Sequence, residues 1–65
     1  MRVDTRRIKI RMAELELTQT LLAKKMGFTK ANMSKYVQGQ IVTFRALERL
    51  ASFLKISPLD LLIDD

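Results

Sequence analysis

The sequence of 65 residues contains no cysteine and no histidine, and each absence removes a class of chemistry. Without cysteine there is no disulfide and no thiolate, which is typical of proteins from a reducing compartment. The usual ligands of zinc are missing, and no cluster of carboxylates replaces them. No pair of side chains is suited to acid-base or nucleophilic catalysis. We therefore expect no enzyme, no metal, no cofactor and no small-molecule ligand.

Long apolar runs, glycine and proline are also scarce. No apolar stretch approaches the roughly 18 residues that a membrane-spanning helix needs, and the start MRVDTRRIKI lacks the apolar block of a signal peptide. We expect a cytoplasmic protein with no membrane partner. The two glycines and the single proline fall at the ends of periodic segments, so residues 1–65 are predicted to form one small domain.

Charge is plentiful but unevenly placed. The formal net charge is +5, and three of the seven acids, Asp60, Asp64 and Asp65, lie in the last six residues. Between Glu16 and Glu48 there is no carboxylate, whereas this interval holds Lys24, Lys25, Lys30, Lys35 and Arg45. A merely solvated surface usually mixes both signs. The one-sided interval favours binding to a polyanion, with affinity gained from released counterions.

The segment 19–38, QTLLAKKMGFTKANMSKYVQ, has the pattern of two short helices joined by a tight turn. Thr18 and Thr29 are suited to cap the two helices, and Gly27 stands where a left-handed residue commonly ends the first. Apolar residues expected to be buried recur at helical spacing, at Leu21, Leu22, Met26, Phe28, Met33, Tyr36 and Val37. This order of helix, sharp turn and helix is that of a DNA-reading helix-turn-helix.

A helical wheel separates the second of these helices into two faces. The face opposite the apolar stripe is short, polar and cationic, and it holds Lys30, Ala31, Ser34, Lys35 and Gln38. Lysine can donate to guanine, serine and glutamine can bond base edges or phosphates, and an alanine methyl can meet a thymine methyl in the major groove. The alternative interpretation is an ordinary solvated face.

Helices are also expected before and after this pair. The spacing of Ile8, Met12 and Leu15 predicts a first helix from Arg6 to Glu16, preceded by a frayed basic arm over residues 1–5. That arm is either solvated or in contact with phosphate. Ile10 lies off the apolar stripe and is either peripheral packing or a partner contact. After Gly39, a second left-handed stop, residues 44–54 are predicted to form a helix capped by Thr43.

A last short helix is predicted to start at Ser57 and Pro58. It contains four large apolar residues, Leu59, Leu61, Leu62 and Ile63, which is more than one face of a short helix can bury. Exposed apolar surface here favours contact with a second copy of the chain. In the alternative, Leu59, Leu62 and Ile63 close the core and Leu61 stands alone.

The run LTQTLLAKKMGFTKANMSKYVQGQ, with a helix before it and RALERLASFLKISPLDLL after it, resembles the lambda-repressor-like, Cro/C1-type helix-turn-helix family over residues 6–63. The resemblance implies a compact all-α domain of five helices, with the helix-turn-helix at helices two and three. It also implies that helix three enters the major groove, commonly as a homodimer on a palindromic operator. In many members an Arg late in helix one pairs with a Glu late in helix three, where this chain has Met12 and Val37.

The resemblance also assigns roles by position. It implies base contacts by Lys30, Ala31, Ser34 and Lys35. It implies phosphate contacts by Gln19, Thr29, Asn32, Gln38, Gln40 and Arg45, with Gln19 also bracing Lys30. The implied function is a transcriptional regulator that binds double-stranded DNA, either a phage repressor or Cro-like protein or a bacterial equivalent. Two alternatives stay open: a protein-interaction module of the same fold, such as an antitoxin or polymerase-recruiting component that docks through Leu59 to Ile63, and a basic amphipathic helix on anionic lipid.

Overall fold

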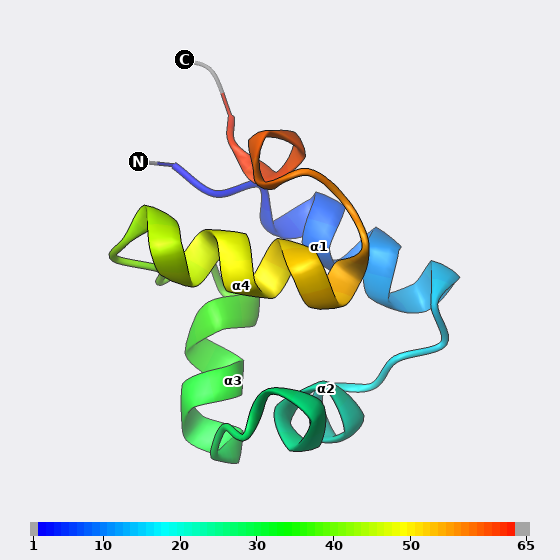
Figure 1. Cartoon of the computed structure of the whole chain (residues 1–65). Coiled ribbons are helices and arrows are strands. Elements are labelled where there is room, and N and C mark those ends of the chain that lie inside the picture. Colours follow the sequence, from blue (N-terminus) through cyan, green and yellow to red (C-terminus); the bar gives the residue numbers. More distant parts are fainter. Residues whose placement is uncertain (1, 64–65) are drawn as a thin grey trace.

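The computed structural model describes residues 2–63, which form four α-helices followed by a single 3₁₀ turn (Figure 1). The elements are α1 (Thr5–Glu14), α2 (Gln19–Met26), α3 (Lys30–Val37), α4 (Phe44–Leu54) and η1 (Pro58–Leu61). The all-α prediction is confirmed, but the fifth helix is wrong. Leu62 takes an extended conformation and pairs with Val3 in an antiparallel bridge, so the backbone cannot continue as a helix.

Each α-helix begins at a side-chain cap that satisfies an otherwise unpaired amide of its first turn. The hydroxyls of Thr18, Thr29 and Thr43 each accept from the amide three residues later, at 3.1, 3.2 and 3.1 Å. All three caps were predicted from the sequence. The cap of α1 is Asp4, whose carboxylate accepts from the amide of Arg7 at 3.1 Å. The first helix therefore begins one residue earlier than predicted.

Left-handed residues end the helices. Gly27 has φ of +71° and Gly39 has φ of +86°, so both predicted glycine stops are confirmed. Two residues other than glycine also take positive φ, Glu16 at +56° and Lys55 at +57°. The left-handed turn at Glu16 explains why α1 ends at Glu14 instead of reaching Glu16 as predicted.

The core draws at least one side chain from every element. It contains Val3, Ile8, Met12, Leu22, Ala23, Met26, Met33, Val37, Ile41, Leu47, Leu50, Ala51, Leu54 and Leu61. Leu21 was predicted to be buried and is 45% exposed, because α2 turns Leu22, Ala23 and Met26 inward instead. Phe28 and Tyr36 pack against the edge of the core and are only partly buried.

The amino-terminal segment is held against the carboxyl-terminal one, and the prediction of a frayed arm over residues 1–5 is wrong for the residues that the structure describes. Val3 is buried, and the amide of Asp4 donates to the carbonyl of Leu61 at 2.7 Å. The amide of Ile63 donates to the carbonyl of Arg2 at 3.0 Å. Met1 lies outside the described residues. The local sequence does not predict this ordered conformation, because it depends on hydrogen bonds to residues some sixty positions away.

The four apolar residues near the carboxyl end are not buried in the way that the alternative prediction from the sequence described. Leu61 is fully buried, whereas Leu59 is 68% exposed and Ile63 is 37% exposed. Leu62 is partly buried against the core. The alternative in which Leu61 stands alone outside the core is therefore wrong. Leu61 is not available for contact with a second copy, and the exposed apolar surface that was expected in this segment lies at Leu59 and Ile63.

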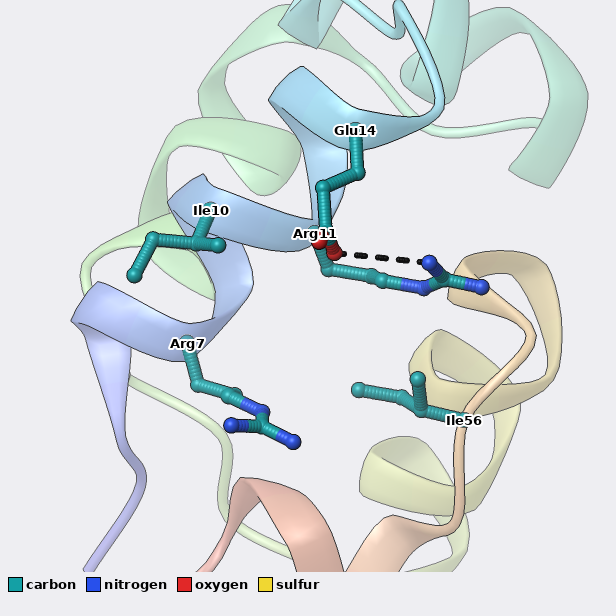
Figure 2. Close-up of a pocket in the computed structure, with 5 residues that line it drawn as sticks. All are labelled: Arg7, Ile10, Arg11, Glu14 and Ile56. Carbon is teal, nitrogen blue, oxygen red and sulfur yellow. Dashed lines mark hydrogen bonds and ion pairs between the residues drawn. The ribbon is translucent and has the colours of Figure 1, made fainter.

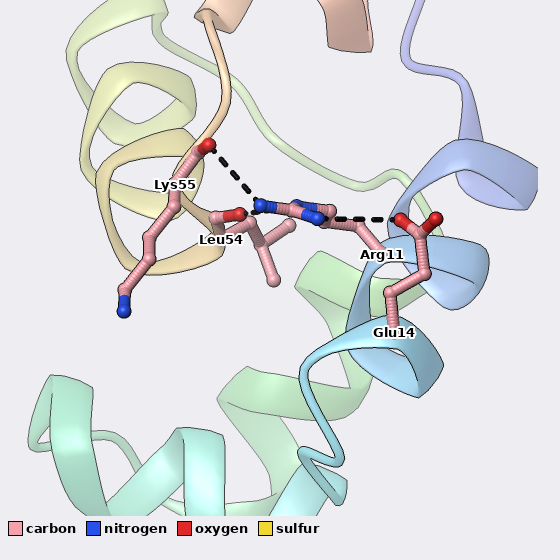
Figure 3. Close-up of polar contacts among 4 residues, drawn as sticks. All are labelled: Arg11, Glu14, Leu54 and Lys55. Atoms are coloured by element: carbon pink, nitrogen blue, oxygen red, sulfur yellow. Dashed lines mark hydrogen bonds and ion pairs between the residues drawn. The ribbon is translucent and has the colours of Figure 1, made fainter.

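A guanidinium joins α1 to the end of α4 (Figure 3). Nε of Arg11 donates to the carbonyl of Leu54 at 2.8 Å, and a terminal nitrogen reaches the carbonyl of Lys55 at 3.4 Å. The same guanidinium pairs with Glu14 at 3.4 Å. Carbonyls in the last turn of a helix have no partner within the helix, and a cation there also meets the negative end of the helix dipole. Arg11 thus caps α4 from outside it.

Candidate nucleic-acid interface

The helix-turn-helix is formed by α2 and α3, which pack against each other in the lower part of Figure 1. The turn between them is only three residues long, from Gly27 to Thr29. The amide of Phe28 donates to the carbonyl of Ala23 at 2.8 Å, and the amide of Gly27 donates to that of Lys24 at 3.3 Å. These bonds satisfy carbonyls at the end of α2 and set the direction in which α3 departs.

Side chains from α3 and α4 hold this turn in place. A guanidinium nitrogen of Arg49 donates to the carbonyl of Met26 at 2.6 Å. The guanidinium carbon of Arg49 also lies 5.3 Å from the centre of the Phe28 ring, within the range of a cation–π contact. Phe28 in turn meets Tyr36 edge to face, with 4.8 Å between ring centres and an interplanar angle of 73°. These contacts link the end of α2, the turn and α3 to α4, and so hold α3 in its orientation.

The outer side of α3 is not covered by the described part of the chain. Met33 and Val37 are buried, at 0% and 3% exposure, as the helical wheel predicted. Residues on the other side are exposed, and they are Lys30, Ala31, Asn32, Lys35 and Gln38. Ser34 differs from the expectation of a fully outward position, because it is only partly exposed. The underside of the helix thus anchors it and leaves a polar, cationic side open to a ligand.

An open groove of about 270 Å³ lies between the amino-terminal parts of α2 and α3. It is lined by Gln19, Thr20, Lys30, Met33 and Ser34. Gln19 of α2 and Lys30 of α3 both line it, and the bracing of Lys30 by Gln19 stays a prediction. On α3, Nε2 of Gln38 donates to Oγ of Ser34 at 3.2 Å, one helical turn away.

Five cations lie in the interval that lacks carboxylates, and all five are exposed: Lys24, Lys25, Lys30, Lys35 and Arg45. None of them takes part in an ion pair within residues 2–63. Their charge is therefore not neutralised by the described part of the protein. Gln40 is exposed in the loop after α3, and Arg45 is exposed in the first turn of α4.

A family model for the Cro/C1-type helix-turn-helix DNA-binding domain matches residues 7–65. The chain belongs to this family. Comparison with curated proteins and comparison with solved structures give no match. The resemblance drawn from the sequence is confirmed, and the domain is a DNA-binding domain of the Cro/C1 type.

This Cro/C1-type domain departs from the family pattern in its core. Met12 and Val37, which stand where many members pair an Arg with a Glu, are both buried, at 7% and 3% exposure. Replacing a buried ion pair by apolar side chains removes the cost of desolvating two charges and need not lower stability. Arg11, the neighbour of Met12, is partly exposed, and its guanidinium donates to a carbonyl at the end of α4.

A smaller depression of about 170 Å³ lies between α1 and the segment after α4, lined by Arg7, Ile10, Arg11, Glu14 and Ile56 (Figure 2). Arg11 and Glu14, three residues apart on α1, pair with each other beside it, and Arg11 also bonds the end of α4. Ile10, which the sequence left open between packing and partner contact, is 54% exposed at this depression. The Arg11 guanidinium in its wall is already bonded to Glu14 and to the end of α4, so we regard the depression as part of the packing between α1 and α4.

Sequence reasoning missed several residues that shape the interface. Arg49 and the bond between Gln38 and Ser34 were not foreseen, nor was Thr20 as a wall of the groove. The spacing of Ser34 and Gln38, four apart on a helix, was the one available signal, since such pairs face each other. Arg49 gave no local signal, because its partner Met26 lies 23 residues away.

Within residues 2–63, no group of three or more acidic, cysteine or histidine side chains could hold a metal ion. No helix among these residues is both long enough and apolar enough to cross a bilayer.

Proposed function

We propose that this Cro/C1-type domain is a sequence-specific transcriptional regulator that binds a double-stranded operator with α3 in the major groove. The observation that carries the proposal is the exposed polar side of α3, anchored by buried Met33 and Val37. A helix fits the major groove, and only there does each base pair present a distinct pattern of donors and acceptors. We assign base contacts to Lys30, Ala31, Ser34 and Lys35.

Phosphate contacts fix the register of such a helix on the duplex. We assign these to Gln19, Thr29, Asn32, Gln38, Gln40 and Arg45, all of which are exposed. Gln19 and Thr29 stand at the starts of α2 and α3, neither of which has an acidic residue in its first turn. The positive end of each helix is therefore left without a competing carboxylate. Uncompensated lysines around them supply the attraction that does not depend on sequence.

The regulator acts as a homodimer in this proposal. Leu59 and Ile63 are exposed beside partly buried Leu62, and together they offer an apolar surface to a second copy. Two-fold pairing through this surface would present two α3 helices to half-sites about one helical turn apart. The operator is therefore expected to be palindromic.

The test is selection from a library of random duplexes, followed by titration of the enriched duplex and a scrambled one. We expect an enriched palindrome that binds two chains, is preferred by about 10³-fold or more over the scramble, and weakens steeply as salt rises. If no duplex is preferred over any other at moderate ionic strength, the proposal fails. Capture of a protein partner through Leu59 and Ile63 in the absence of DNA would then favour the interaction-module alternative.

A further inference from the structure

Two of the four side chains that α3 offers to base edges can only donate hydrogen bonds, and none can only accept. Lys30 and Lys35 carry ammonium groups, which donate and cannot accept, and Ala31 offers only a methyl group. No carboxylate lies on α3. The remaining candidate for a base contact is Ser34, whose hydroxyl can act either as a donor or as an acceptor. Its orientation therefore decides what this part of the helix can read.

Gln38 fixes that orientation. Its Nε2 donates to Oγ of Ser34 at 3.2 Å, so one lone pair of the hydroxyl is already occupied. The hydroxyl has a single hydrogen, and serine in a helix often gives it to the carbonyl four residues earlier. No such bond to a backbone carbonyl forms in the part of the chain that the structure describes. The Ser34 hydrogen is therefore left to bond an acceptor on a ligand.

Lys30 and Ser34 line the same groove, one helical turn apart on α3. Among the four bases, guanine alone presents two acceptors, O6 and N7, in the major groove. Adenine pairs an acceptor with an amino donor, which would face the Lys30 ammonium unfavourably. Cytosine presents a donor, and thymine presents one acceptor beside a methyl group. A groove lined by two donors therefore matches the guanine edge.

We propose that the groove between α2 and α3 reads a guanine in each half-site, with Lys30 and Ser34 as donors to O6 and N7. Gln38 acts as a positioning residue that keeps the Ser34 hydroxyl a donor. Gln19, on the opposite wall of the groove, contacts phosphate and does not read the base. This inference rests on the proposed function, because it requires α3 to lie in the major groove.

The first test replaces single guanines in the enriched operator by modified bases. In 7-deazaguanine the N7 acceptor becomes a C–H group, whereas inosine keeps N7 and O6 and loses only the minor-groove amino group. At one guanine in each half-site we expect 7-deazaguanine to weaken binding on the order of tenfold. Inosine at the same position is expected to bind within about twofold of guanine. An equal loss with both bases would contradict major-groove reading of N7.

The second test uses protein variants on operators that carry each of the four bases at that position. Lys30→Ala and Ser34→Ala are expected to reduce the preference for guanine on the order of tenfold. Gln38→Ala is expected to reduce it less, since the hydroxyl stays but loses its orientation. Lys25→Ala is the matched control, because it removes an exposed lysine of α2 that does not line the groove. That variant should weaken all four operators equally.

The outcomes separate this inference from the proposed function. If selection enriches no motif, the regulator proposal itself fails. If a motif is enriched but has adenine, cytosine or thymine at the position that Lys30→Ala relaxes, the regulator proposal stands and the guanine assignment is overturned. A guanine preference that survives in both Lys30→Ala and Ser34→Ala also overturns it. Circular dichroism of each variant excludes unfolding as the cause of a loss.

Discussion

A guanidinium nitrogen of Arg49 in α4 donates to the backbone carbonyl of Met26, the last residue of α2, at 2.6 Å. This carbonyl has no partner within its own helix, so the bond satisfies it with a charged donor. The same guanidinium lies over the Phe28 ring, in the turn that leads to α3. The angle between the two helices of the motif therefore depends on a residue outside the motif.

We expect Arg49→Ala to lower the free energy of unfolding by about 1–2 kcal/mol, because a charge-assisted bond and a partly exposed cation–π contact are lost together. Urea denaturation measures this change. Arg45→Ala is the matched control, since Arg45 is an exposed arginine of the same helix with no such partner in the described residues. It should change stability by less than about 0.5 kcal/mol. Equal losses in the two variants would show that the Arg49 bond contributes nothing.

The features predicted correctly from the sequence are those decided by near neighbours. Thr18, Thr29 and Thr43 bond amides three residues away, and Gly27 ends α2 through its own backbone conformation. Each of these preferences is written in a window of four or five residues. The buried stripe of α3 was predicted for the same reason, because Met33 and Val37 lie four apart on one helix.

The features that were missed depend on residues far away in sequence. Val3 is ordered by Leu62, and Arg11 caps a helix that ends 43 residues later. Leu21 and Leu22 have the same side chain, so only the packing of α2 against its neighbours decides which one is buried. The sequence predicted which face of α3 forms the candidate interface. It did not predict the bond from Gln38 to Ser34, because that bond depends on the side-chain conformations.

Alanine substitutions at the two glycines can separate the effect of a steric clash from the effect of backbone strain. Both have positive φ, but a Cβ at Gly27 would meet nothing within 4 Å, whereas at Gly39 it would lie 2.9 Å from the Thr5 methyl group. Gly27→Ala should lower the free energy of unfolding by about 1 kcal/mol through backbone strain alone. Gly39→Ala should lower it further, because the clash with Thr5 adds to the strain. Thr5→Ser removes the opposing methyl group and should recover the excess in the double variant. Additive losses in a thermal or urea double-mutant cycle would rule out the clash.

Thr29 combines a structural and a proposed binding role, and one substitution separates them. Aspartate caps helices at least as well as threonine, so Thr29→Asp should keep stability within about 0.5 kcal/mol. It places a negative charge beside the proposed phosphate path and should weaken binding to every duplex on the order of tenfold or more. Ser57→Asp, which changes the cap of η1, is the matched control for net charge. Fluorescence anisotropy should find a far smaller loss for Ser57→Asp than for Thr29→Asp.

The proposed dimer surface is tested by adding charge to it. Leu59→Glu places a carboxylate on a side chain that is 68% exposed, so the monomer should remain folded. Sedimentation should then detect monomer at concentrations where the native chain is dimeric. The variant should bind the enriched palindrome more weakly than the native chain does, whereas its affinity for a single half-site should be unchanged. Ile10→Glu, at 54% exposure on α1, is the control. Dissociation by Ile10→Glu and not by Leu59→Glu would move the interface to α1.

Substitutions of Lys35 and of Arg45 should affect DNA binding in different ways, because Lys35 is assigned to bases and Arg45 to phosphate. Lys35 is exposed on the outer side of α3, and Arg45 is exposed in the first turn of α4. We expect Lys35→Ala to relax the preference at one base position with a loss of about 1–3 kcal/mol. Arg45→Ala should weaken operator and random duplex alike and reduce the salt slope by about one.

The measurement is titration of operator, single-base variants and random duplex at several salt concentrations. Each variant loses one positive charge, so a purely electrostatic role for both residues predicts the same change in salt slope and no change in base preference. A reading role for Lys35 predicts a loss that is confined to one position and is larger on the operator than on random DNA. Equal effects of Lys35→Ala on the two duplexes would assign Lys35 to phosphate, and base reading would then fall to the amino-terminal part of α3, at Lys30, Ala31 and Ser34.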